Sequence, residues 1–311
     1  MSEENVREYQ VNIGCVIVTY NRLEKLKRTL ESYSNQKLLP KYVIVVNNAS
    51  TDQTSDFLKT WSNQKEPFEK IVITTSENLG GSGGVYVGEK KAMELNSSWI
   101  MIADDDAYPE PDYILGMAQY LQKNSQENIS IICGKVVEND SFVSIHRSIW
   151  RSKWDRNFHK PIGEEFYKKE KFNPDFVSYV GILLNKEKLK YAGLVCKGNF
   201  IWCDDTEHTY RMSQEGRIVC LPSYSIIHDV EAANDSLSWK YYYGYRNDLI
   251  FFKKHFKFHF PVVLGKLALK TLCSPLIGRT RKEFFLRFHA MYDALIGKMG
   301  VDNIYKPGWK P

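Results

Sequence analysis

The sequence predicts an α/β fold: a doubly wound, mostly parallel sheet flanked by helices, followed by a helical C-terminal extension. Two observations predict it. Buried apolar runs alternate with segments of helical periodicity in the first third of the chain, which is typical of βαβ units. Clusters of polar residues follow each apolar run, at the strand ends where such sheets bind ligands. We expect one domain in residues 1–235 and a basic, aromatic helical region in residues 236–311.

The expected elements of the first half follow one another in order. Four apolar runs predict buried strands, at residues 11–20, 41–48, 70–75 and 98–106. Apolar side chains at helical spacing, or helix-start signals, follow in three segments, at residues 21–34, 49–61 and 85–95. The glycine-rich stretch ENLGGSGG, residues 77–84, is expected to form a loop before the third helix.

The second half of the chain is less regular. The stretch DFVSYVGILLN (175–185) predicts a strand, or a bend around a buried glycine, and residues 202–216 predict a short helix. Two short strands are expected at residues 217–222 and 223–228. A helical, basic segment begins near Trp239.

The composition is ordinary for a globular protein, with 43% apolar and 25% charged residues among 311. Six scattered cysteines form no CxxC pair, so we expect buried, reduced thiols rather than disulfides or a zinc site. The polar N-terminus predicts no signal peptide, and no apolar run reaches the length of about 18 residues that spans a bilayer. We therefore expect a cytoplasmic protein.

Charge is unevenly distributed along the chain. Residues 239–311 carry 14 Lys/Arg and 4 Asp/Glu, a net charge of +10, against −5 for residues 1–238. This basic, aromatic region is expected either to contact an anionic membrane surface or to form a helical lid on the first domain. Nucleic acid is not an expected partner, because the acidic body supplies no basic groove.

The stretch IMIADDDAYPEPDYI (100–114) ends an apolar run in three adjacent aspartates. Neighbouring carboxylates at the end of a buried strand are costly unless a cation neutralises them, and oxygen ligands suit Mg²⁺ or Mn²⁺. Because strand side chains alternate, Asp104 and Asp106 should share one face while Asp105 points away. The pattern predicts a metal and diphosphate site, with a solvated acidic turn as the alternative.

The glycines of NLGGSGG allow close backbone approach or an N–H nest for anions, unless they form only a flexible turn. The dinucleotide pattern GxGxxG is not met, because Tyr86 occupies the third glycine position. His228 ends an apolar stretch, and as a lone histidine it is more often structural than a ligand.

The stretch WCDDTEH begins the expected short helix. Asp204 and Glu207 match a capping box, and Glu207 faces Arg211 one turn later. Asp205 is left at the helix start, where we expect the carboxylate to stay ionised, as a general base requires. A plain helix-start acid is the alternative.

These segments together resemble the family 2 glycosyltransferases of the GT-A fold, and most of all bacterial galactofuranosyltransferases and their rhamnosyltransferase relatives. The matching segments lie between about residues 11 and 255: VIVTYNR, VVNNASTD, ENLGGSGG, ADDDA, WCDDTEH, His228 and YYYGYRND. The resemblance implies a GT-A-type catalytic domain in residues 1–235. This domain would transfer a sugar from a nucleotide diphosphate to a hydroxyl, with inversion of the anomeric configuration.

The resemblance also implies roles for individual residues. Asp205 would be the catalytic base, and Asp104, Asp106 and His228 would hold Mn²⁺ or Mg²⁺. The residues implied in binding the nucleotide-sugar are Thr19, Asn21, Asn47, Asn48, Asp52, Asn78, Gly80, Gly81, Gly83, Asp104, Asp105, Trp202, Asp204 and Arg246. The family usually has Asp where Asn47 stands, so both uracil and thymine are open as the base.

The expected activity is the transfer of galactofuranose from UDP-galactofuranose to a glycan or lipid-linked glycan in cell-surface polysaccharide synthesis, by an enzyme peripheral to the cytoplasmic face of the membrane. A dTDP-rhamnose transferase, another UDP-hexose transferase and a non-catalytic nucleotide-sugar-binding protein are the alternatives. A sugar nucleotidyltransferase would carry a glycine-rich loop after the first strand, where VTYNRLEK has no glycine. A two-metal phosphodiesterase would need further histidines and carboxylates.

Overall fold

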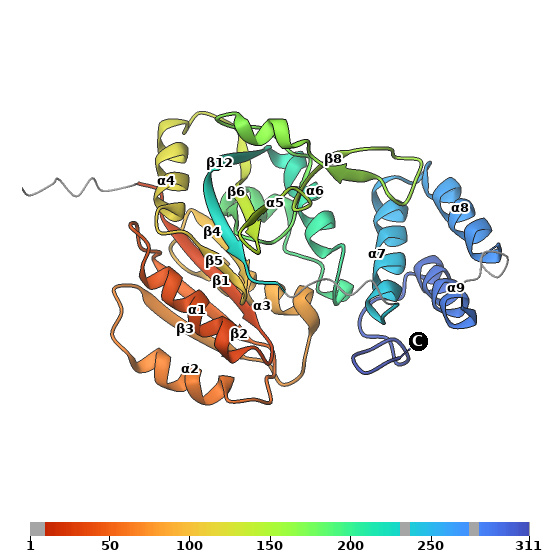
Figure 1. The fold of residues 1–311 in the computed structure, drawn as a ribbon, viewed down its shortest axis with the longest axis horizontal. Coiled ribbons are helices and arrows are strands. Elements are labelled where there is room, and N and C mark those ends of the chain that lie inside the picture. Colours follow the sequence, from red (N-terminus) through yellow and green to blue (C-terminus); the bar gives the residue numbers. More distant parts are fainter. Residues whose placement is uncertain (1–9, 231–236, 274–279, 311) are drawn as a thin grey trace, which may run out of the picture.

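A computed structural model describes residues 10–230, 237–273 and 280–310 of the chain. The expected domain boundary between residues 235 and 236, and most of the polar N-terminus, lie outside the described residues. In the described part, nine strands form one sheet in the order β3-β2-β1-β4-β11-β6-β12-β5, with β7 paired to β6 (Figure 1). A second, three-stranded sheet has the order β10-β8-β9.

The first half of the chain is the predicted parallel sheet with its helices. Its elements are β1 (Ile13–Thr19), α1 (Leu23–Ser34), β2 (Tyr42–Asn47), α2 (Thr54–Asn63), β3 (Glu69–Thr74), α3 (Gly80–Glu94) and β4 (Trp99–Asp104). Strand β1 pairs in parallel with β2 on one side and with β4 on the other. Thr19 lies opposite Asn47, and Val18 lies opposite Asp104, so the polar strand ends meet at one edge of the sheet.

Helices cover both faces of this sheet, as the doubly wound prediction requires. Alternate residues of β1 point in opposite directions. Cys15 and Ile17 belong to the buried cluster that includes residues of α1, α2 and α4 (Tyr113–Lys123), whereas Val16 belongs to the cluster that includes residues of α3, α5 (Lys186–Ala192) and α6 (Asp204–Glu215). Burial on both faces explains why the strands are almost continuously apolar. The predicted fold class is confirmed.

The second half completes the sheet. Its strands are β5 (Ala107–Pro109), β6 (Ile129–Glu138), β7 (Ser141–Val143), β8 (Arg147–Trp150), β9 (His159–Pro161), β10 (Phe176–Val177), β11 (Ile182–Asn185) and β12 (Arg217–His228); short 3-10 helices lie at Glu164–Lys168 and Lys197–Asn199. Strands were predicted where β10, β11 and β12 lie, and the others were not predicted. Strand β11 is antiparallel to β4 and β6, and β12 is parallel to β6. The expected bend around a buried glycine is present at Gly181, whose φ is +71°.

Three local predictions are wrong. The glycine-rich stretch is not a loop up to residue 84, because α3 already begins at Gly80. The two short strands at 217–228 are one strand, β12, with an irregularity between Leu221 and Ser225. The capping box is absent: Cys203 precedes α6 with a left-handed backbone, and no side chain caps the helix.

The C-terminal helices are α7 (Lys240–His255), α8 (Phe260–Leu272) and α9 (Arg281–Ile296), and Figure 1 shows them together at one end of the molecule. They bury an aromatic core that they share with Phe158, Phe176 and Phe200 of the first part of the chain. All six cysteines are free, and Cys15, Cys133 and Cys220 are buried. Among the described residues, no helix is both long and apolar enough to cross a membrane.

Candidate active site

A cavity of about 530 Å³ opens at the carboxyl edge of the parallel strands. Strand ends, the start of α3 and the start of α6 surround it, as the order of the sheet requires. The predicted residues that line it are Thr19, Asn48, Asn78, Gly80, Gly81, Asp104, Asp105, Asp204, Asp205 and His228. Residues from distant parts of the sequence therefore meet in one place.

The three predicted metal ligands lie together. Suitable atoms of Asp104, Asp106 and His228 are all within 4.8 Å of one another. Asp104 ends β4, and His228 ends β12, where it pairs with Ala107 of the neighbouring β5. The turn from β4 into β5 thus carries the aspartates to the histidine.

This cluster fits a divalent ion. The buried Oδ1 of Asp106 has no hydrogen-bond partner and lies 3.5 Å from Nε2 of His228. Burial, and then the charge of Asp106, raises the pKa of Asp104 to about 7. Carboxylate oxygens and one imidazole nitrogen form a donor set that suits Mn²⁺ or Mg²⁺, whose charge would offset this crowding.

Asp105 does not point away from its neighbours as strand alternation predicted, because β4 ends at Asp104 and a turn follows: Asp105 lines the same cavity as Asp104 and shares Arg22 with Asp106. Its carboxylate accepts hydrogen bonds from Thr19 Oγ1 at 2.7 Å and from Arg22 Nη1 at 3.3 Å. Arg22 also donates to Asp106 at 2.7 Å. Sequence reasoning missed Arg22. A positive charge at the start of a helix is unfavourable unless an acidic residue lies close to it, and this signal could have identified Arg22.

The start of α3 is held against the cavity by Asn48. Its Oδ1 accepts from the backbone N–H of Leu79, and its Nδ2 donates to the carbonyl of Gly80. Gly80 has a φ of +73°, and a Cβ there would lie 2.1 Å from the carbonyl oxygen of Phe200. The N–H groups of Leu79, Gly80 and Ser82 donate to protein acceptors, which favours close backbone approach over the anion nest.

Two predicted donor-binding residues shape the loop after β2 instead of lining the cavity. Asn47 is fully buried; it accepts from the Ser50 N–H and donates to Ser55 Oγ. Asn21 has a φ of +54°, and its side chain accepts from the Thr51 N–H. Their hydrogen bonds fold the loop, so we assign neither of them a contact with a nucleobase.

Asp52, Asp106, Gly83 and Arg246 were also predicted at the site and also lie off the cavity. Asp52 and Asp106 line an adjoining cavity of about 530 Å³, together with Asn21. Gly83 packs against the side chain of Leu79. Arg246 is fully buried and donates to the carbonyls of Gly198, Asn199 and Gly300, which joins α7 to two loops. We assign Arg246 no contact with a ligand.

Asp205 occupies the first turn of α6, at the cavity wall. The N–H and Oγ1 of Thr206 donate to it at 2.6 and 3.2 Å. The expectation of a fully ionised carboxylate is wrong, because burial, and then the charge of Asp204, raises the pKa of Asp205 to about 7. Asp204 itself accepts from Ser82 Oγ at 2.9 Å, which ties α6 to α3. The expected ion pair of Glu207 with Arg211 is confirmed at 3.0 Å.

Next to Asp205 lies a smaller cavity of about 210 Å³. Trp202, 40% exposed, contributes one wall. The other residues that line it are Arg156, His159, Cys203, Thr206, Tyr241, Gly244, Tyr245 and Asp248. Aromatic faces alternating with polar groups are suited to a saccharide.

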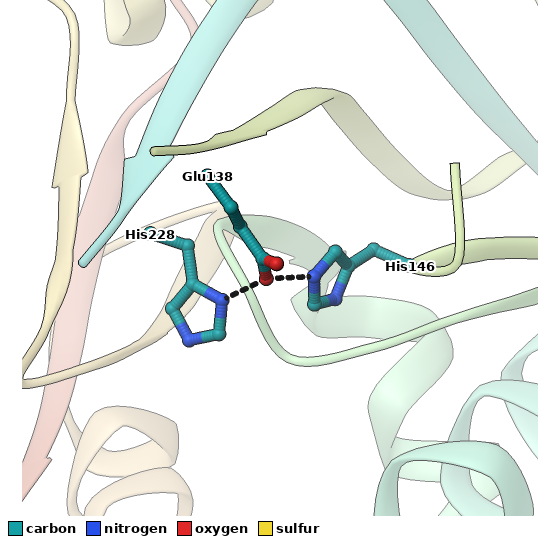
Figure 2. A group of neighbouring side chains, drawn as sticks. All are labelled: Glu138, His146 and His228. Atoms are coloured by element: carbon teal, nitrogen blue, oxygen red, sulfur yellow. Dashed lines mark hydrogen bonds and ion pairs between the residues drawn. The ribbon is translucent and has the colours of Figure 1, made fainter. Parts of the chain in front are cut away.

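A second group of side chains surrounds His228. Oε1 of Glu138 lies 2.8 Å from Nδ1 of His228 and 2.7 Å from Nε2 of His146 (Figure 2). Sequence reasoning missed this group, because Glu138 and His228 are 90 residues apart and meet only through the pairing of β6 with β12. The C-terminal residues Trp239, Lys240 and Pro307, which also line the larger cavity, were missed because no sequence pattern links them to the distant strand ends.

Comparisons with known proteins bear on the family and fold of the chain. Residues 15–190 match the family model described as glycosyl transferase family 2. The chain is similar to galactofuranosyltransferase GlfT1 of Mycolicibacterium smegmatis, with 32% identity over 103 residues, or 33% of this chain and 32% of that protein. It is also similar to the uncharacterized glycosyltransferase YwdF of Bacillus subtilis, with 31% identity over 112 residues, or 36% and 39%. The matches thus span about a third of the length of these curated relatives.

Solved structures share the fold. The crystal structure of S. aureus TarS 1-349 in complex with UDP-GlcNAc has a TM-score of 0.59 and 15% identity, over 91% of this chain and 81% of that chain. The crystal structure of GalNAc-T7 with UDP, GalNAc and Mn²⁺ has a TM-score of 0.62 and 14% identity, over 93% and 56%. At these identities the likeness concerns the GT-A fold alone.

Proposed function

The chain belongs to glycosyl transferase family 2, and on that footing we propose that it is a metal-dependent, inverting glycosyltransferase. It moves a sugar from a nucleotide diphosphate to a hydroxyl of a glycan or lipid-linked glycan in cell-surface polysaccharide synthesis. One observation carries the proposal: Asp104 and His228, which cluster with Asp106, line the same cavity as Asp205, a carboxyl group whose pKa is about 7.

The donor lies in the larger cavity. Thr19, Asn48, Asn78, Gly80, Gly81 and Asp105 line it beside the acidic cluster and provide hydroxyl, amide and backbone groups for a nucleotide-sugar. UDP-galactofuranose is our first choice of donor, because relatives named galactofuranosyltransferase GlfT1 share about a third of this chain. A dTDP-rhamnose or another UDP-hexose donor remains the alternative.

Asp104, Asp106 and His228 would hold Mn²⁺ or Mg²⁺, which would stabilise the negative charge that develops on the leaving diphosphate. Asp205 takes the proton of the acceptor hydroxyl while that oxygen forms its bond to the anomeric carbon. The bond from that carbon to the diphosphate oxygen breaks, and the nucleotide diphosphate leaves. A single displacement inverts the anomeric centre without a covalent enzyme intermediate.

The acceptor approaches from the smaller cavity. Thr206 contributes to its wall and hydrogen-bonds the Asp205 carboxylate, so this cavity begins beside the base. The exposed ring of Trp202 and the nearby Tyr241, whose ring centroids lie 5.5 Å apart, offer apolar faces on which a sugar ring packs.

The enzyme works at the cytoplasmic face of a membrane, as a peripheral protein. Helix α9 supports this, because apolar side chains that are 47–59% exposed recur along one face of it: Phe285, Phe288, Tyr292, Leu295 and Ile296. The acids of residues 239–311 have partners within the protein: Asp248 pairs with Arg156, Glu283 with Arg287, and Asp293 and Asp302 with Lys298. The remaining surface charge is therefore mostly cationic, which complements anionic lipid headgroups.

The test is a panel of UDP- and dTDP-sugars with MnCl₂, scored first by thermal shift and then by transfer to a saccharide acceptor. A bound donor should raise the melting temperature by mass action. Asp106→Ala should abolish the manganese-dependent part of that shift. If a nucleotide-sugar binds but is neither transferred nor hydrolysed, the protein is a binding module and the enzymatic proposal fails.

A further inference from the structure

Glu138 and His146 contact the predicted metal ligand His228 without belonging to the predicted ligand set (Figure 2). We propose that they are positioning residues, which fix the tautomer and the ring orientation of His228 so that Nε2 faces the ion. This inference rests on the metal-binding part of the proposed function. It assigns a role to two residues that neither sequence pattern nor family resemblance had singled out.

Strand pairing brings Glu138 and His228 together. Glu138 is the last residue of β6 and His228 the last of β12, and the residues before them, Val137 and Ile227, are partners in the parallel register. Side chains one residue further along both strands emerge on the same side of the sheet. The 2.8 Å contact between them is therefore a product of the fold rather than of flexible side chains.

The hydrogen bond to Glu138 decides the tautomer of His228. A carboxylate only accepts, so Nδ1 of His228 must carry the hydrogen. In the neutral ring Nε2 then keeps its lone pair, and it is this atom that lies 3.5 Å from the unpartnered Oδ1 of Asp106. A carboxylate behind a ligating histidine is a recurrent way of orienting a metal ligand and making it more basic.

His146 holds the carboxylate in place from the other side. Its Nε2 donates to Glu138 Oε1 at 2.7 Å, which leaves its Nδ1 to accept from Ser178 Oγ at 2.8 Å. The ring stands edge-on to that of His228, with centroids 5.2 Å apart and an interplanar angle of 81°. Ser178, His146, Glu138 and His228 thus form a series of hydrogen bonds in which each contact pairs one donor with one acceptor.

The backbone around His146 is fixed by buried groups. The tight turn between β6 and β7 uses positive φ angles at Asn139 and Asp140, +49° and +60°. The fully buried Arg147 then donates to the carbonyls of Gly134, His146 and Val180. These bonds tie the returning segment to the end of β6, so His146 is held opposite Glu138.

The group of Glu138, His146 and His228 is a less suitable ion site than the cluster of Asp104, Asp106 and His228. Its two nitrogen-to-oxygen distances, 2.7 and 2.8 Å, are those of hydrogen bonds that share one oxygen atom. Two ligands of one ion would instead need open lone pairs directed at a common point. The open acceptor, Oδ1 of Asp106, lies on the other side of His228.

The inference is tested by binding of Mn²⁺ alone to the full chain, measured from the electron paramagnetic resonance signal of the free ion. Glu138→Gln keeps the size of the side chain but removes its charge, and we expect it to weaken Mn²⁺ binding by about 10- to 100-fold. The ¹⁴N coupling of the bound ion should also decrease, which a purely structural role would not cause. Glu127→Gln, a change at an acid paired with Lys171 and Arg217 on the surface, is the matched control and should bind like the wild type.

A second variant keeps the test decisive if Glu138→Gln does not fold. His146→Leu removes the second contact to the carboxylate, and we expect a several-fold loss of Mn²⁺ affinity in the folded variant. If the wild type binds Mn²⁺ and both folded variants bind it equally well, the positioning role is overturned while the glycosyl-transfer proposal stands. If the wild type itself binds no Mn²⁺, the metal-binding part of the proposed function fails instead.

Discussion

Asp205 is subject to opposing influences. The first turn of a helix and the hydrogen bonds of Thr206 favour the ionised carboxylate, whereas burial and the adjacent Asp204 favour the neutral acid. The result is a pKa of about 7, close to the value at which a general base is most effective. Residue type and spacing suggested Asp205 as the base, but its pKa depends on how deeply the packing of α6 buries it.

This balance predicts a pH profile. Since only the ionised form of Asp205 accepts a proton, kcat/KM should rise as the pH increases through about 7 and level off above it. Asp205→Asn should lower turnover by about a hundredfold or more at every pH, with donor affinity nearly unchanged.

Thr206→Val provides the accompanying control, because it removes one hydrogen bond that favours the ionised carboxylate. The rise in kcat/KM should then move to higher pH. A profile that is already flat at pH 5.5, or a fully active Asp205→Asn variant, would reject Asp205 as the base. Initial rates measured across the pH range with saturating Mn²⁺ decide the matter.

For individual residues, the sequence was a better guide to which residues lie close together than to the direction in which their side chains point. Asp104, Asp106 and His228 are brought together, because strand ends of one sheet converge on the same edge. Asn47 and Arg246 were also expected at the ligand, but their polar atoms bond to the protein itself. A residue's type does not tell whether its hydrogen bonds go inward or outward.

At the scale of elements, the glycines of α3 have distinct roles that their shared motif hides. A Cβ at Gly84 would lie 2.4 Å from Val18 Cγ1, and one at Gly88 would lie 2.2 Å from Val16 Cγ1. These two glycines let the helix pack directly on β1. At Gly81 nothing lies within 4 Å of the added atom.

Gly84→Ala should therefore lower the free energy of unfolding by about 1–3 kcal/mol, the usual effect of overpacking. Gly81→Ala adds the same methyl group to open space in the same helix and should leave stability unchanged or raise it by up to about 1 kcal/mol. Urea denaturation of the two variants beside the wild type is the measurement. Equal losses from both substitutions would contradict the packing explanation.

The elements of the first half could be predicted because each strand is a short apolar run and each helix follows at once. In the second half, strands were predicted where β10, β11 and β12 lie, but β5 to β9 were not, because β6 pairs with β12 across a long intervening segment and β5 is only three residues long. The start of α3 was missed for a different reason. Glycine is a poor helix former, but tertiary packing against β1 outweighs that local preference.

At the scale of the whole molecule, the division into residues 1–235 and 236–311 remains a prediction. The helices on one side of that boundary bury Tyr242, Tyr243 and Phe252 in the core that contains Phe158, Phe176 and Phe200. Apolar side chains shared in this way would be exposed if either part stood alone. Tests of the C-terminal helices are therefore better made with point substitutions in the full chain than with truncations.

The exposed face of α9 gives such a test. The full chain should float with vesicles of phosphatidylcholine and phosphatidylglycerol, and added salt should reduce this, because part of the attraction is between charges. Combining Phe285→Ser with Phe288→Ser removes two exposed rings and should reduce the floating fraction several-fold, without changing transfer to a soluble acceptor.

Tyr191→Ser is the control, since Tyr191 is 79% exposed on α5, away from these helices in the sequence and fold. Flotation that is the same for all three proteins would reject α9 as the membrane contact. If the double substitution instead converts a dimer to a monomer in sedimentation, the face binds a second copy of the chain.

Trp239, Lys240 and Pro307 form part of the cavity wall, and this affects when the cavity is complete during biosynthesis. The strands and helices of the first half leave the ribosome early and can fold as they emerge. The wall of the proposed donor cavity, however, is not complete until residue 307 has been translated and lies against it. An unfinished polypeptide therefore lacks part of the wall of this cavity until nearly the whole of this sequence has been made.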